Sequence, residues 1–266
     1  MPERHIGTVF DDGAADFERL APPLWNPMGN ALVAAADIAL GDRVLDAGCG
    51  SGATTIPAAQ FAGPDGVVDG VDLSARMLAL AQAKADTLSL NNVHLAQADV
   101  TSWQPDAPYD AVISAYSVFF LPDMDAGAAH LVSLLRSGGR FAVSSWAEGS
   151  WEPFRELLWK ACLQERPELS TLPQPSIGNA ERLHTPEKLE SWLTSLGLAE
   201  ITVTPTPGQV QLSPSLAWSL VLGGGFRTLL PVDPAAQKRV RAAFLAELGE
   251  DFDLNTDTLI ATAVRA

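Results

Sequence analysis

Short apolar runs alternate with longer amphipathic segments through the first half of the chain. The segments with helical spacing of apolar residues cover about residues 53–61, 75–88 and 125–136. The apolar runs are bounded by glycine, proline or acidic residues and predict β-strands at residues 43–46, 66–72, 93–98, 109–115 and 140–146. Strands that alternate with helices predict right-handed crossovers and a parallel sheet covered by helices on both faces.

The second half of the chain follows a different pattern. Residues 151–165 predict an amphipathic helix, and residues 166–182 form a proline-rich connection. Residues 199–212 and 257–264 predict two further strands, so we expect a helical insertion between the fifth and sixth strands. Later helices begin with a capping residue followed by proline, at Thr185-Pro186, Ser213-Pro214 and Asp233-Pro234.

The N-terminal region is expected to be helical only in part. Residues 1–13 predict a loose arm, whereas residues 14–20 and 30–40 have helical spacing. The length of 266 residues fits one domain. We divide it into an N-terminal helical segment, a ligand-binding core, a helical insertion or lid, and C-terminal strands and helices that complete the sheet, at residues 1–40, 41–147, 148–198 and 199–266.

The composition argues against several classes of partner. The formal net charge is −15 and the sequence pI is about 4.5, so neither nucleic acid nor an anionic membrane is expected. The two cysteines, Cys49 and Cys162, lack the spacing of a disulfide framework or a zinc site, and no metal is expected. The sequence shows no signal peptide and no apolar run of about 18 residues, which predicts a cytoplasmic protein. The oligomeric state is left open.

The stretch at residues 43–55, RVLDAGCGSGATT, organises the rest of the chain. A strand that ends in a glycine-rich turn and opens a helix is typical of nucleotide binding. Glycine lets the backbone approach a ligand closely, and the helix N-terminus offers free N–H groups. Residues 48–53 satisfy the pattern G-x-G-x-x-A, and Asp72 follows downstream. An NAD-dependent oxidoreductase is therefore one interpretation.

Three carboxylates favour a different ligand. Asp46, Asp72 and Asp99 each follow or end one of the first three strands, so they line the sheet edge where parallel sheets bind ligands. Asp46 stands beside the glycine turn, where it would repel a dinucleotide phosphate and attract a cationic group. S-adenosylmethionine carries an ammonium and a sulfonium at one end, a ribose diol and an adenine amine, and no phosphate. It therefore suits all three acids.

Five motifs in order resemble the class I S-adenosylmethionine-dependent methyltransferases. Within that class they are similar to the ubiquinone/menaquinone-biosynthesis-like branch (methyltransferase type 11/25) that acts on small molecules. The motifs are VLDAGCGSGATT, GVDLSARML, AQADV, YDAVISAYSVFFLPD and LLRSGGRFAVSSW, and the resemblance covers about residues 10–147. It implies a Rossmann-like, doubly wound α/β fold with a seven-stranded sheet, mostly parallel with an antiparallel last strand, plus a helical lid insertion.

The resemblance also implies how the cofactor, S-adenosylmethionine, is held. Asp46 would bind the methionine ammonium, assisted by the carbonyl of Ser114, and Asp72 would bind the ribose hydroxyls. Asp99 would accept from the adenine amine, and the backbone of Val100 would meet the ring. An acid at a strand end can instead cap the next helix, which is the alternative for each. The remaining contacts would come from Gly48, Cys49, Gly50, Leu73 and Met77.

The function implied is transfer of a methyl group to an oxygen, nitrogen or carbon nucleophile of a small, largely apolar metabolite, as in secondary metabolism. Proximity and orientation would supply most of the catalysis, and S-adenosylhomocysteine would be the second product. Phe119-Phe120 stand where several relatives carry a His pair, which leaves Tyr116 and His184 as candidate catalytic residues. The expected acceptor pocket comprises Phe17, Trp25, Tyr116, Ser117, Phe119, Phe120 and Trp146.

Two other functions stay open on the sequence. A protein of this kind can keep S-adenosylmethionine as a structural ligand, or use the charge of its sulfonium to guide a cyclisation, without transferring a methyl group. The NAD-dependent oxidoreductase is the third hypothesis.

Overall fold

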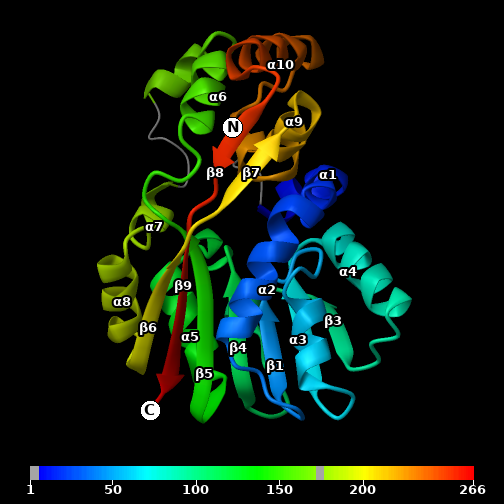
Figure 1. The fold of residues 1–266 in the computed structure, drawn as a ribbon, viewed down its shortest axis with the longest axis vertical. Coiled ribbons are helices and arrows are strands. Elements are labelled where there is room, and N and C mark those ends of the chain that lie inside the picture. The colour runs from blue at the N-terminus through cyan, green and yellow to red at the C-terminus, as the bar shows by residue number, and fades with distance from the viewer. Residues whose placement is uncertain (1–5, 172–176) are drawn as a thin grey trace.

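A twisted sheet with helices on both faces forms the lower body of the molecule (Figure 1). The computed structural model describes residues 6–171 and 177–266. The order of the strands across the sheet is β3-β2-β1-β4-β5-β9-β6. Their bounds are β1 Arg43–Ala47, β2 Val67–Asp72, β3 Val93–Gln97, β4 Tyr109–Ala115, β5 Leu135–Trp146, β6 Leu198–Thr206 and β9 Thr258–Arg265.

The direction of the strands confirms the predicted fold class. Strands β1 to β5 pair in parallel, whereas β9 runs antiparallel to both of its neighbours, β5 and β6. The parallel order reverses at β1, which has β2 on one side and β4 on the other. In such sheets the crevice at the carboxyl ends of the strands around this reversal is where ligands bind. The glycine turn follows β1 directly.

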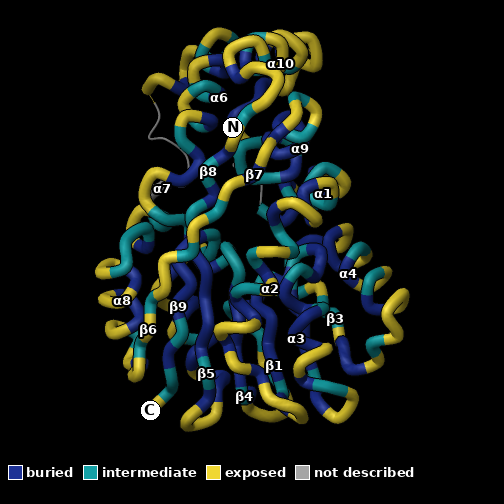
Figure 2. Tube along the Cα trace, in the orientation of Figure 1, coloured by how far each residue is buried: buried dark blue, intermediate teal, exposed yellow. Residues whose placement is uncertain are grey.

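Alternate residues of the strands supply two separate cores. Val44, Ala111 and Ala142 face α2 (Asn26–Ala35), α3 (Thr55–Ala62) and α4 (Ala75–Thr87). Leu45 and Phe141 face the opposite side, which is covered by α5 (Met124–Ser133) and α8 (Pro186–Ser195). Because both faces are covered, the central strands read as continuous apolar runs, and Figure 2 shows them buried.

Helix α1 (Ile6–Arg19) begins earlier than the sequence predicts. Residues 6–13, expected within a loose arm, are helical; residues 1–5 of that arm lie outside the described residues. Tertiary contacts explain the difference. Asp11 accepts hydrogen bonds from the hydroxyl of Ser74 (2.6 Å) and the backbone N–H of Arg76 (3.0 Å), at the start of α4. These bonds hold residues 6–13 against the start of a helix 63 positions away in the sequence.

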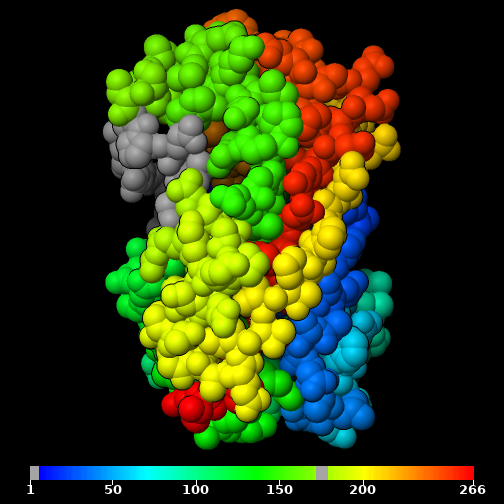
Figure 3. All heavy atoms as spheres, turned by 60° about the vertical axis from the view of Figure 1, so that its left-hand side comes forward, coloured from blue at the N-terminus to red at the C-terminus, as the bar shows by residue number. Residues whose placement is uncertain are grey.

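A cap stands above the carboxyl edge of the sheet (Figure 1). It comprises α6 (Phe154–Leu163), α9 (Pro214–Gly223), α10 (Pro234–Leu248) and a two-stranded antiparallel sheet of β7 (Gln209–Leu212) and β8 (Phe252–Asn255). The cap has its own apolar core, around the fully buried Phe154 and Phe244. Figure 3 shows α6 and the C-terminal region side by side, and Lys160–Glu247 (2.7 Å) and Arg239–Glu165 (2.7 Å) join them.

The cap differs in extent from the expected lid at residues 148–198. Helix α8, at the end of that range, packs on the sheet beside β6, whereas β7, α9, α10 and β8 come from the C-terminal range that was expected to complete the sheet. The strand expected at residues 199–212 is accordingly two strands, broken at Pro207-Gly208. Asp257 accepts a hydrogen bond from the Gly208 N–H (2.9 Å), which turns the chain out of the large sheet and into the cap.

The connection expected at residues 166–182 lies only in part within the described residues. It contains the short helix η4 (Pro167–Thr171) and the short helix α7 (Ile177–Glu181); residues 172–176 lie outside the described part.

Candidate functional site

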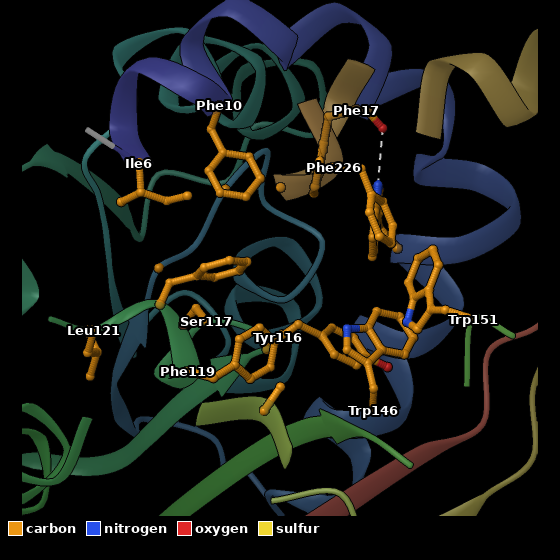
Figure 4. A pocket seen from close by; sticks show the side chains of 18 of the residues that line it. Ile6, Phe10, Phe17, Tyr116, Ser117, Phe119, Leu121, Trp146, Trp151 and Phe226 are labelled. Atoms are coloured by element: carbon orange, nitrogen blue, oxygen red, sulfur yellow. Dashed lines mark hydrogen bonds between the residues drawn. The ribbon is translucent and has the colours of Figure 1, made fainter. Parts of the chain in front are cut away.

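A cavity of about 710 Å³ opens between the carboxyl edge of the sheet and the cap. Ligand pockets usually measure roughly 300–1,000 Å³, so this one has room for a small molecule and a nucleoside together. Its wall combines the glycine turn, the ends of β2, β3, β4 and β5, the helix α1 and parts of the cap. Figure 4 shows aromatic side chains from α1, the end of β4 and the cap turned toward a common space.

The glycine turn needs glycine for two reasons. Gly48 and Gly50 have φ angles of +73° and +52°, which side chains disfavour. A Cβ at Gly48 would also lie 2.6 Å from the side chain of Ser117, at the end of β4. The Gly48 and Cys49 N–H groups donate to the carbonyl of Val71 (2.9 and 3.1 Å), which ties the turn to β2. At Gly48 and Gly50 the turn therefore presents backbone to the cavity.

Asp46 lies directly beneath this turn and is completely buried. Its Oδ2 accepts hydrogen bonds from the hydroxyls of Thr54 (2.7 Å) and Thr55 (2.6 Å). Its Oδ1 has no partner among the described residues. Burial raises the pKa of Asp46 to about 6, and the two hydroxyls oppose that rise. An unpartnered carboxylate oxygen in a buried site suits a cationic group supplied by a ligand.

Asp72 closes the turn onto the end of β2. One carboxylate oxygen accepts from the Gly50 N–H and the other from the Ser74 N–H, each at 2.8 Å. Burial raises the pKa of Asp72, and these backbone donors oppose the rise. A carboxylate has about four acceptor sites, so Asp72 keeps capacity for a diol while its side chain is held in place.

Asp99 follows β3 and is the most exposed of the three acids. Its Oδ1 accepts from the N–H (2.9 Å) and the hydroxyl (2.7 Å) of Thr101, which caps the short helix η2 (Val100–Ser102). The capping alternative considered from the sequence is therefore present at Asp99. The same residue lines the cavity together with Val100, so capping and ligand binding are compatible here.

The structure brings most of the predicted cofactor residues to one cavity. Eight of the ten line it: Gly48, Cys49, Gly50, Asp72, Leu73, Met77, Asp99 and Val100. Asp46 and Ser114 do not form part of its surface. Ser114 is buried at the end of β4, where its hydroxyl donates to the carbonyl of Ala47 (3.0 Å) and contacts the hydroxyl of Ser117. Both residues support the wall from behind.

All seven residues of the expected acceptor pocket line the same cavity. Phe17 and Trp25 form one stacked pair, with centroids 4.6 Å apart and planes 8° apart, and the indole N–H of Trp25 donates to the Phe17 carbonyl (3.1 Å; Figure 4). Tyr116 and Trp146 form a second stacked pair, 4.0 Å and 17°. The remaining three members of the predicted pocket are Ser117, Phe119 and Phe120.

The two candidate catalytic residues are both occupied by neighbours. The Tyr116 hydroxyl hydrogen-bonds the Thr258 hydroxyl (2.7 Å), and burial raises the pKa of the phenol well above its ordinary value. His184 lines the cavity, but its Nε2 lies 2.6 Å from the ammonium of Lys188, which donates to it. The Nε2 of His184 and the hydroxyl of Tyr116 are thus both engaged by neighbouring side chains.

Several wall residues were not predicted from the sequence. Ile6 and Phe10 come from α1, and Phe226 comes from the short helix η5 (Gly225–Leu229) of the cap. The spacing of Ile6, Phe10 and Phe17 on one side of α1 is the signal that could have found the first two. Trp151 and Trp159 line the cavity and also pack against the apolar core of the cap, in which Phe154 between them is fully buried.

The described residues contain no cluster of three or more side chains suited to a metal ion. Among the helices described, none is both long enough and apolar enough to cross a membrane.

The chain is similar in sequence to proteins that are named as methyltransferases. The chain is 34% identical over 173 residues to the aklanonic acid methyltransferase DauC of Streptomyces sp. (strain C5), which covers 62% of this chain and 79% of that protein. It is 32% identical over 137 residues to the nocamycin O-methyltransferase of Saccharothrix syringae, covering 51% of this chain and 49% of the relative. It therefore spans about half of the second relative.

The fold is also shared with solved structures. A S-adenosylmethionine-dependent methyltransferase from Aquifex aeolicus superposes with a TM-score of 0.56 at 13% identity, over 95% of this chain and 98% of the other. The family model of the methyltransferase domain matches residues 44–139. These findings decide against the NAD-dependent oxidoreductase considered from the sequence. The chain belongs to the class I S-adenosylmethionine-dependent methyltransferases, and its cofactor is S-adenosylmethionine.

Proposed function

We propose that this enzyme methylates an oxygen, nitrogen or carbon nucleophile of a small, flat and largely apolar metabolite in secondary metabolism. The observation that carries the proposal is the aromatic wall of the acceptor side. Oxygen is the favoured nucleophile because one relative is named as a nocamycin O-methyltransferase, and the aklanonic acid methyltransferase supports a small-molecule acceptor.

The aromatic wall consists of two stacked pairs that face the same cavity. Phe17 and Trp25 reach it from the N-terminal region, and Tyr116 and Trp146 from the sheet edge. Ring faces gain most from contact with another flat ring system, which supports an acceptor with a planar unsaturated framework. A wall of this kind also excludes water and stabilises a strongly charged acceptor poorly.

The buried polar atoms of the sheet edge fit the cofactor. Asp46 lies just behind the glycine turn, and its unpartnered Oδ1 would hold the ammonium of the methionine part directly or through a water molecule. Asp72, which lines the cavity, would accept from the ribose hydroxyls. Asp99 and the Val100 N–H would meet the adenine, with Leu73 and Met77 on its faces. The backbone of Gly48, Cys49 and Gly50 would line the methionine and ribose parts of the cofactor. Ser114 would assist Asp46 at the ammonium.

When bound, S-adenosylmethionine supplies an activated methyl group on sulfur. The chain's own residues orient the acceptor along the line of transfer and keep water out. Tyr116 and His184 are engaged by Thr258 and Lys188, so we propose that neither takes the acceptor's proton. The nucleophile of the acceptor then either has a free lone pair, as a neutral amine does, or enters the site already ionised, as a carboxylate or an acidic phenol does.

The test is product analysis with a paired set of acceptors. The full chain is incubated with isotopically labelled S-adenosylmethionine and flat aromatic phenols or carboxylic acids. Each carboxylic acid is matched by its saturated-ring analogue, which keeps the ionisable group. Mass spectrometry should show labelled methyl on the flat acceptors and an equal amount of S-adenosylhomocysteine. Equal turnover of multiply charged acceptors would contradict the apolar pocket. An altered acceptor without a labelled methyl would support the non-methylating function instead.

A further inference from the structure

We propose that Thr54 and Thr55 are positioning residues for the cofactor, because they fix the Asp46 carboxylate so that Oδ1 is the oxygen left for its amino group. The proposal rests on the role proposed above for Asp46. It gives a function to two residues at the end of the glycine-rich motif, of which Thr54 also lines the cavity.

The two hydroxyls converge on one oxygen. Thr54 and Thr55 donate to the same Oδ2, at 2.7 and 2.6 Å, and both residues are almost completely buried. Two short donors on one oxygen fix the orientation of the carboxyl group. They also leave Oδ1 as the acceptor that a ligand can use, and Oδ1 is the atom without a partner in the described structure.

Thr54 gives up a more usual role to make this contact. It occupies the N-cap position of α3, where a threonine hydroxyl normally accepts from a free N–H of the first helical turn. No such side-chain cap bond is present at Thr54, although the other long helices that begin with a serine, threonine or aspartate cap have one. A broken local rule at a cofactor site indicates that the side chain serves the site.

The same hydroxyls keep Asp46 charged. The titratable groups that face it are the Asp72 carboxylate from β2 and the Cys49 thiol from the turn, and Asp72 acts in the same direction as burial. None of the ion pairs formed by the described residues includes Asp46. The Thr54 and Thr55 donors are therefore what lowers the pKa of Asp46 against its burial. Loss of either hydroxyl should raise that pKa.

The experiment compares two ligands that differ only at the amino-acid end. S-adenosylhomocysteine carries the ammonium, whereas 5′-methylthioadenosine keeps the adenosine and lacks the amino acid. Calorimetric titrations of the full chain should show that Thr55→Val and Thr54→Val each lower the affinity for S-adenosylhomocysteine by roughly tenfold at pH 7. This is the size expected for one hydrogen bond to a charged group. Binding of 5′-methylthioadenosine should stay unchanged.

Three further measurements sharpen the test. Thr54→Ser and Thr55→Ser keep the hydroxyls and should restore affinity, and Thr87→Val, an exposed threonine on α4, should have no effect. For the unchanged protein, S-adenosylhomocysteine affinity should fall as the pH drops through about 6, because protonated Asp46 no longer attracts the ammonium. In the valine variants this loss should begin at a higher pH.

The outcomes separate the two proposals. If Asp46→Asn leaves S-adenosylhomocysteine affinity unchanged, the role of Asp46 is wrong. If Asp46→Asn weakens it but the valine variants do not, only the positioning role is wrong. If Thr55→Val lowers the affinities for both ligands equally, the hydroxyl serves only the fold. If a valine variant fails to fold, the serine variants and the pH dependence still decide, because serine must restore both.

Discussion

The ring of Tyr116 lies on the indole of Trp146, with centroids 4.0 Å apart and planes inclined by 17°. The Tyr116 backbone has a φ of +50°, an uncommon angle for a residue with a side chain. Its hydroxyl is held by Thr258 of β9. The chain thus accepts a strained residue at the end of β4, and the stacked pair that results forms a wall of the cavity.

Removing the indole should affect the acceptor and spare the cofactor. We expect Trp146→Ala to lower kcat/KM for a flat acceptor by about 10- to 100-fold, because an aromatic face in contact with the substrate is lost. S-adenosylhomocysteine affinity, measured by calorimetry, should change little. Trp146→Phe should fall between, and Phe61→Ala, at an exposed ring on α3, serves as the control. A matched loss of cofactor affinity would contradict this division of the cavity.

The crossing of α1 and α9 is close enough to require glycine in both helices. A Cβ at Gly13 would lie 2.4 Å from the carbonyl oxygen of Leu222, and one at Gly223 would lie 2.4 Å from the backbone nitrogen of Phe17. We expect Gly223→Ala to lower the free energy of unfolding by about 1–3 kcal/mol, as overpacking does, in urea denaturation. Gly225→Ala, whose nearest contact would be 3.7 Å away, should be close to neutral. Equal effects would argue against a tight crossing.

The difference between the sequence and the structure is largest in the cap. The alternating strands and the three acids could be predicted because each depends on local pattern: an apolar run, then a turn, then a helix. The pairing of Gln209 with Asn255 joins two short strands across an inserted helical region. Neither strand has a sequence pattern that identifies the strand with which it pairs. The number of strands in the large sheet followed from the apolar runs, whereas the antiparallel direction of the last strand followed from the family resemblance.

The acceptor side shows the same limit. Trp25, Tyr116 and Trp146 could be placed at the cavity because each stands near the predicted sheet edge or the N-terminal segment. Phe226 could not, because its position depends on the cap, whose helix α9 crosses α1 at Gly13 and Gly223. That crossing depends on small residues. In a sequence, a glycine inside a predicted helix indicates a less stable helix and does not indicate that another helix packs against it.

Lys84 joins the N-terminal helix to the glycine turn. Its ammonium lies 2.8 Å from Glu18 of α1 and 2.9 Å from the carbonyl of Ser51. We expect Lys84→Met to lower stability by about 1 kcal/mol and to speed hydrogen exchange of the α1 amides, because this half-buried link is lost. Lys160→Met, which removes a more exposed pair with Glu247, should change neither. Unchanged exchange in α1 would show that its packing on α9 holds it unaided.

The buried carboxylate of Asp46 should lower the free energy of unfolding at neutral pH when no ligand is bound. Burial holds its pKa at about 6, above the ordinary 3.8, so as the pH rises the unfolded chain releases this proton first. Its contribution is therefore fully favourable below pH 3.8 and is lost as the pH rises through about 6. We expect Asp46→Asn to be more stable than the unchanged protein at pH 7, by on the order of 2 kcal/mol, with no difference near pH 3.8.

Urea denaturation at both pH values checks this expectation, and S-adenosylhomocysteine should narrow or reverse the difference at pH 7 by stabilising the unchanged protein more than the variant. A variant that is less stable at pH 7 without ligand would show that the Asp46 carboxylate serves the fold rather than the ligand.

The last prediction concerns the base. A true general base contributes roughly 10²- to 10⁴-fold to a rate, so its removal is easily seen. His184 has one ring nitrogen occupied by Lys188, and the Tyr116 hydroxyl is occupied by Thr258. We expect His184→Ala and Tyr116→Phe each to keep kcat within about threefold, because His184→Ala leaves the aromatic wall intact and Tyr116→Phe keeps its ring. A loss of 10²-fold or more in either variant, with S-adenosylhomocysteine affinity unchanged, would identify that residue as the base. The same measurements across pH should show a rate that follows ionisation of the acceptor, so that a more acidic phenol reaches its maximum rate at a lower pH.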